Sequence, residues 1–129
     1  MFGTIVDGQV HLRSPGQIAE SVWVTLPRQF AHVKLDEYVF MPNHMHAIIE
    51  LTDLNPAQHL SRAALWEIVR VCKAATSYQI RHTEDKPWFA WQDDYFDTVI
   101  KTEIALQRIH QYIVENPLRW TQDELYKRY

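Results

Sequence analysis

Two histidines separated by one residue, His44 and His46, are the side chains in this chain that most directly suggest chemistry. On a β-strand such residues share one face, about 6–7 Å apart along the backbone, because strand side chains alternate. Two neutral imidazoles on one face can bind a single divalent ion, with Met45 turned toward the core. A bare His-x-His pair is more often two ordinary histidines, but the Pro-Asn turn before it and the apolar run after it favour the metal site.

A tyrosine and an asparagine four residues apart, Tyr112 and Asn116, follow near the C-terminus. On a helix they point the same way, one turn apart, and Tyr112 lies at the edge of the apolar stripe. On spacing alone, a packed aromatic followed by a helix-capping asparagine is the more common arrangement. Combined with the two histidines, however, an amide oxygen and a phenol suit metal-assisted phosphoryl transfer, in which the phenol is the nucleophile.

The mixed nitrogen and oxygen ligands predict Mg²⁺ or Mn²⁺ as the metal in the cell, with tighter binding of later transition metals. Histidine binds a metal only when it is neutral. We therefore expect activity to fall below about pH 6.

A third feature is a basic face on the longest helical pattern, with aromatic residues beside it. Its cations are Arg62, Arg70, Lys73 and Arg81, and the aromatic residues are Trp66 and Tyr78. Cations interleaved with aromatic rings can follow a single nucleic-acid strand and stack its bases. A solvated helix face is the more common origin of such a pattern, and both interpretations stay open on spacing alone.

The elements that position these residues can be read from turn signals and periodicity. We expect a hairpin over 4–13, helices over 15–26, 57–82 and 103–115, and strands over 33–41, 44–51 and 95–100. Asp7-Gly8 marks the hairpin turn, and Pro27 is expected to stop the first helix. Mixed elements with antiparallel strands predict an α+β fold.

Composition sets limits on these interpretations. The chain has 129 residues, which is enough for one domain over 1–129 but not for two. Its net charge of −3 argues against a protein that coats nucleic acid through bulk electrostatics, although a local basic groove stays possible. The single cysteine, Cys72, allows no internal disulfide, and we find no signal peptide or membrane segment, so we expect a cytoplasmic protein.

Four runs, in this order, resemble one known family. They are YVFMPNHMHAIIEL, VRVCKAATSYQI, WQDDYFDTVIK and RIHQYIVENPLRW. Together they are similar to the REP-associated tyrosine transposases, within the HUH superfamily of single-strand transposases. The resemblance implies a ferredoxin-like antiparallel sheet with helices packed on one face. It also implies a homodimer that cleaves and joins single-stranded DNA near hairpins, through a 5′-phosphotyrosine intermediate and a free 3′-hydroxyl.

Residue roles follow from the same resemblance. His44 and His46 would be metal ligands and Asn116 the third ligand. Tyr112 would be the nucleophile, and Lys73 would contact DNA. Whether the tyrosine serves the histidines of its own chain or those of a partner stays open.

The chain departs from the family pattern at three places. A strand that usually precedes Phe2-Gly3 has no counterpart, Asp93-Asp94 stands where the family often has a basic residue, and Thr98 replaces a histidine. These departures favour an alternative, a degenerate or domesticated relative that binds hairpin DNA without cutting it. A third interpretation is a zinc hydrolase whose ligands are drawn from the four histidines His32, His44, His46 and His110.

Overall fold

The computed structural model describes residues 2–52, 62–83 and 97–122, with side chains omitted at 62, 63, 121 and 122. The chain divides into two compact units. The first comprises Met1–Gly16, Glu37–Ile48 and Gln92–Tyr129, and the second comprises Gln17–Asp36 and Ile49–Trp91. None of the helices in the described ranges has the length and apolar content needed to cross a membrane.

The first unit begins with a hairpin of β1 (Gly3–Val6) and β2 (Gln9–Leu12), paired antiparallel. Its two-residue loop has positive φ at both positions, 51° at Asp7 and 73° at Gly8, as a type I′ turn requires. A Cβ on Gly8 would clash only with the side chain of Leu118, which is exposed and can move, so the positive φ is the main reason for glycine here. The hairpin expected from Asp7-Gly8 is confirmed.

The helix that follows, α1 (Ser14–Gln29), is longer than the expected 15–26, and Pro27 lies inside it. The prediction that Pro27 ends the helix is wrong. Proline removes only its own N–H donor, and the helical pattern resumes at once, because the Phe30 N–H donates to the Leu26 carbonyl at 2.9 Å. Pro27 also lies in the last turn of α1, where only Arg28 and Gln29 follow it, so little of the helix depends on it.

A second two-stranded sheet is formed by β3 (Val33–Phe40) and β4 (Met45–Leu51), as the sequence predicts. The Met41 N–H donates to the His44 carbonyl at 2.8 Å and closes the turn between the strands. The Phe2 N–H donates to the Pro42 carbonyl at 3.0 Å, which anchors that turn to the N-terminal segment. His44 is therefore held at the junction of turn and strand rather than within the strand.

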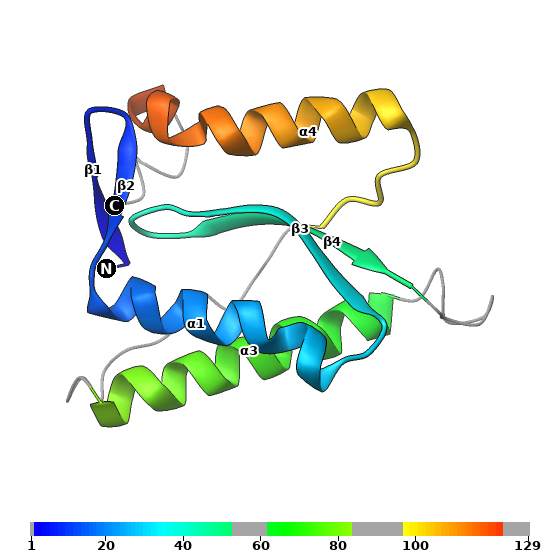
Figure 1. Cartoon of the computed structure of the whole chain (residues 1–129), viewed down its shortest axis with the longest axis horizontal. Helices are drawn as coiled ribbons and strands as arrows, with labels where there is room; N and C mark the ends of the chain where they lie inside the picture. The colour runs from blue at the N-terminus through cyan, green and yellow to red at the C-terminus, as the bar shows by residue number, and fades with distance from the viewer. Residues whose placement is uncertain (1, 53–61, 84–96, 123–129) are drawn as a thin grey trace. The chain divides into compact units, whose positions relative to one another are not determined.

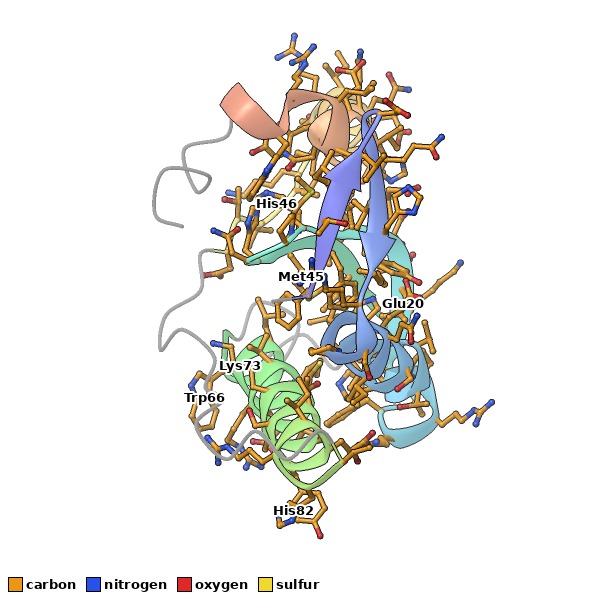
Figure 2. All side chains as sticks on the ribbon, turned by 90° about the vertical axis from the view of Figure 1, so that its left-hand side faces the viewer. Glu20, Met45, His46, Trp66, Lys73 and His82 are labelled. Carbon is orange, nitrogen blue, oxygen red and sulfur yellow. The ribbon has the colours of Figure 1, made fainter. Side chains whose placement is uncertain are left out.

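In the second unit, α3 (Arg62–Thr83) lies side by side with α1 in both Figure 1 and Figure 2. The residues that α3 buries recur at helical spacing: Ile68, Cys72, Thr76 and Ile80. The predicted helix over 57–82 is confirmed from residue 62 onward, and 57–61 lie outside the described residues.

The first unit ends with α4 (Glu103–Glu115), followed by the 3-10 helix η1 (Asn116–Gln122). The Thr102 side chain caps α4 by accepting from the Ala105 N–H at 3.1 Å. In Figure 1, α4 runs alongside the part of the β3–β4 hairpin that carries the turn, and Ile113 is buried.

The strand predicted over 95–100 is wrong for 97–100, which have no regular structure, while 95 and 96 lie outside the described residues. Thr98 and Val99 are exposed, so this apolar run has no buried face that would fix it as a strand. Three helices and two antiparallel two-stranded sheets in the described ranges confirm the α+β class. The ferredoxin-like sheet with helices on one face stays a prediction.

Candidate functional site

The imidazoles of His44 and His46 converge on one point in the first unit. Their Nε2 atoms are 3.1 Å apart, and their rings meet edge to face with centroids 4.7 Å apart. This is closer than the spacing of alternate residues along a strand, because His44 lies at the turn and only His46 lies within β4. Figure 2 shows Met45 and His46 on opposite sides of β4, as alternation requires.

The spacing of the two nitrogens fits a shared divalent ion. Two ligand atoms that each lie about 2.1 Å from one metal ion, with an angle of about 90° at the metal, are about 3.0 Å from each other. The observed Nε2–Nε2 distance of 3.1 Å is close to this value. Within the described residues, no cluster of three or more His, Cys, Asp or Glu side chains could hold a metal. Among the residues that the structure describes, a third protein ligand would therefore be a donor of another kind, such as an amide oxygen.

Asn116 carries such an oxygen. Its side chain is only 3 % exposed, and its Oδ1 is buried without a hydrogen-bond partner. A buried acceptor without a partner costs about 1–3 kcal/mol, and a ligand bound to the Oδ1 would remove that cost. An amide oxygen is also a good ligand for Mg²⁺ or Mn²⁺. The chemistry of this orphaned atom fits the metal that the sequence predicts.

The ring of Tyr112 packs against His46. Its ring centroid lies 5.2 Å from that of His46, at an interplanar angle of 73°. The residue is 48 % exposed, so its phenol is open to solvent rather than sealed in the core. Asn116 follows one helical turn later, at the C-cap of α4.

Two further residues hold His44 and were missed in the sequence analysis. The Asn43 Oδ1 lies 2.6 Å from the His44 Nδ1, and the Trp120 ring stacks on His44 at 6.0 Å and 24°. Asn43 stands in the predicted turn, and an amide directly before a candidate histidine ligand is the signal that could have indicated this contact. Trp120 carries no such signal, because it follows Asn116 within a 3-10 segment whose backbone leaves the helical angles at Arg119.

The predicted basic face lies in the second unit, on α3. Arg70 is exposed and lies over the Trp66 ring at 5.9 Å, but its guanidinium also pairs with Glu67 at 2.6 Å. The hydrogen bond from Arg70 lowers the pKa of Glu67, and the same bond raises the pKa of Arg70. Figure 2 shows Trp66 and Lys73 on the same side of α3.

The other members of this face are placed less completely. Arg81 is exposed near the end of α3, and Tyr78 is 65 % exposed with its ring 4.3 Å from that of His82. Arg62 is the first residue of α3, and its side chain lies outside the described residues. Exposed aromatic and basic side chains thus share this helix, as a nucleic-acid surface requires.

The remaining sequence signals contribute little to the site. Asp93 and Asp94 lie outside the described residues, and Thr98 is exposed. His32 contacts the Phe30 ring at 5.9 Å, in the other unit from the His44–His46 pair. The described residues thus give no four-histidine cluster in support of the zinc hydrolase.

Comparison with known proteins bears directly on this geometry. The family model described as "Transposase IS200 like" matches residues 28–116, which include both histidines, Tyr112 and Asn116. An uncharacterised protein of Haemophilus influenzae is 32 % identical, in an alignment that covers 98 % of this chain and 77 % of that protein. No solved structure matches the chain. The match over most of the chain shows that it belongs to the IS200-like transposase family.

Proposed function

We propose that this chain is a metal-dependent transposase that cuts and rejoins single-stranded DNA through a phosphotyrosine at Tyr112. The observation that carries the proposal is the meeting of three groups in one chain. The two Nε2 atoms lie 3.1 Å apart, and the exposed Tyr112 ring packs against His46. Family membership supports DNA as the substrate.

Each residue has a defined task in this reaction. His44, His46 and Asn116 would hold Mg²⁺ or Mn²⁺, which when bound polarises a phosphate oxygen and stabilises the charge of the transition state. The Tyr112 phenol oxygen attacks the phosphorus, so a bond from tyrosine to phosphorus forms and the bond to the 3′ oxygen breaks. The phenol loses its proton and the departing 3′ oxygen gains one. A second 3′-hydroxyl reverses these steps and rejoins the strand.

The basic face of α3 would bind the DNA strand away from the reacting phosphate. Arg62, Arg70, Lys73 and Arg81 would contact phosphates, and exposed Trp66 and Tyr78 offer rings on which bases can stack. A homodimer and a cytoplasmic location complete the proposal. Sedimentation of the purified protein tests the dimer.

The decisive experiment looks for the covalent intermediate. Single-stranded DNA with a hairpin and a 3′ label is incubated with the protein and Mn²⁺, and labelled protein is detected on a denaturing gel. Tyr112→Phe should lower adduct formation by at least about a thousandfold. Tyr38→Phe, which removes a tyrosine hydroxyl from β3 at a position with no role in the proposal, is the matched control and should leave the adduct unchanged.

The alternatives predict different results in the same assay. If no Tyr112-dependent adduct forms across a library of hairpins while filter binding persists, the chain is a DNA-binding relative that does not cut. If DNA is hydrolysed equally by Tyr112→Phe but not by Asn116→Ala, the chemistry is that of a metal hydrolase.

A further inference from the structure

The hydrogen bond between Asn43 and His44 has a consequence for the tautomer of the histidine. An amide oxygen only accepts hydrogen bonds, so the Oδ1–Nδ1 distance of 2.6 Å requires the proton of neutral His44 to lie on Nδ1. The lone pair of the ring then lies on Nε2, the atom that faces His46. Free histidine favours the opposite tautomer, with the proton on Nε2.

From this geometry we propose that Asn43 is a positioning residue that fixes His44 in its metal-binding tautomer before any metal arrives. This inference rests on the proposed function, since it takes the Nε2 atoms as the metal-binding atoms. A ring nitrogen that binds a metal must carry no proton, and a hydrogen bond to the other nitrogen sets which one is bare. Asn43 supplies that bond from the adjoining turn position, and Trp120 stacks on the ring.

The two histidines are consequently not equivalent. When Nε2 of His44 is bare, the 3.1 Å contact is a hydrogen bond only if the proton of His46 lies on its Nε2. His46 must therefore move its proton to Nδ1 when a metal binds, whereas His44 needs no change. Metal binding is expected to alter the tautomer of one ring only.

Nuclear magnetic resonance tests the inference without any measurement of DNA cleavage. Long-range proton–nitrogen correlation spectra at about pH 8 distinguish the two neutral tautomers, because protonated and bare ring nitrogens have different ¹⁵N shifts. The His44 peaks are assigned by their loss in His44→Gln. We expect the Nδ1–H form at His44 and the Nε2–H form at His46 in the metal-free protein. Addition of Mg²⁺ or Zn²⁺ should convert only His46.

Two substitutions separate positioning from a structural role. Asn43→Ala should shift His44 toward the Nε2–H form and weaken Mn²⁺ binding about 10–100-fold in calorimetry. Asn43→Asp keeps an acceptor for the Nδ1–H and should restore both the tautomer and the affinity. Gln9→Ala, at an exposed amide of β2, is the control and should change neither.

The outcomes distinguish this inference from the proposed function. An Nε2–H tautomer at His44 in the wild-type protein would overturn it, as would Mn²⁺ binding equally tight in wild type and Asn43→Ala. An equally weak Asn43→Asp would overturn it as well. If the wild-type protein binds no divalent ion at all, the proposed function fails, while the tautomer of His44 still reports whether Asn43 sets it.

Discussion

Replacing Asn116 with alanine should affect the free energy of unfolding differently in the metal-free and in the metal-bound protein. The Oδ1 of this residue is buried and has no hydrogen-bond partner, which costs the metal-free protein about 1–3 kcal/mol. Alanine removes that cost and leaves a small cavity worth about 1 kcal/mol. Asn116 has helical backbone angles of φ −55° and ψ −44°, which alanine adopts readily. The metal-free variant should therefore be as stable as the wild type, or up to about 2 kcal/mol more stable.

Asn116 should stabilise the protein only when metal is added. At a metal concentration 100 times its Kd, the wild-type protein gains about 2.7 kcal/mol of stability. For a variant that binds the metal about 100-fold more weakly, the same metal concentration equals its Kd, and the variant gains only about 0.4 kcal/mol of stability. For a chain of this size, 1 kcal/mol corresponds to about 4 °C in Tm. Mn²⁺ should thus raise the Tm of the wild type by about 10 °C and that of Asn116→Ala by about 1–2 °C.

Thermal and urea unfolding with and without Mn²⁺ measure both quantities. Gln111→Ala is a matched control, because it removes an amide from the exposed side of the same helix, where it donates to Glu115 at 2.9 Å. That variant should stay within about 0.5 kcal/mol of the wild type and keep the full response to Mn²⁺. If Asn116→Ala loses more than about 1 kcal/mol without metal yet responds to Mn²⁺ like the wild type, Asn116 is a helix cap and the proposed ligand set is wrong.

Substitutions at three other places test neighbouring parts of the argument. Trp120→Ala removes the ring stacked on His44 and should weaken Mn²⁺ binding, measured by calorimetry, while Trp120→Phe should restore most of it. Glu67→Ala releases the Arg70 guanidinium and should tighten single-stranded DNA binding at low salt, whereas Arg70→Ala should weaken it and flatten the salt dependence; filter binding measures both. Burial raises the pKa of the Cys72 thiol to about 11, so the neutral thiol favours folding below about pH 9, and that contribution is lost as the pH rises toward 11. Urea unfolding of Cys72→Ala should therefore show a smaller loss of stability over this range than the wild type.

Elements with strong local signals could be predicted from the sequence. The hairpin follows from Asp7-Gly8, where both residues adopt positive φ. The last helix follows from its apolar spacing, with Thr102 as its cap. The two strands around Pro42-Asn43 also follow from their turn signal and β-rich runs. In each case one or two residues set the local conformation, so no distant contact is needed to infer it.

The arrangement of the site could be predicted only in part. The sequence paired His44 with His46 and Tyr112 with Asn116, but the approach of the two Nε2 atoms to 3.1 Å depends on His44 lying at a turn rather than within the strand. The contact of Trp120 with His44 depends on the 3-10 helix after Asn116, which breaks the regular helical period. Such contacts between distant segments leave no periodic signal in a sequence.

The partner of Arg70 is a different kind of omission. Glu67 stands three residues before it on the same helix, a spacing at which opposite charges commonly pair. Glu67 offsets the charge of Arg70, so the effective charge of this face is lower than its four cations indicate. The spacing of Glu67 and Arg70 along the helix is therefore enough to predict this ion pair from the sequence.

The proposed ligand set consists of neutral groups, and this choice has a consequence that a final substitution can test. Two imidazoles and an amide leave the full +2 charge of the bound ion to face the phosphate, which suits a chain whose own net charge is −3. Asn116→Asp keeps an oxygen at the same position but adds a negative charge. Mn²⁺ affinity should therefore rise, because a carboxylate is a stronger ligand for this ion than an amide. The rate of adduct formation at saturating Mn²⁺ should fall, because less positive charge is left to stabilise the transition state. Calorimetry and a time course on denaturing gels measure the two effects. A rate that rises together with affinity would mean that metal occupancy, rather than the charge of the site, limits the reaction, and the argument from neutral ligands would be wrong.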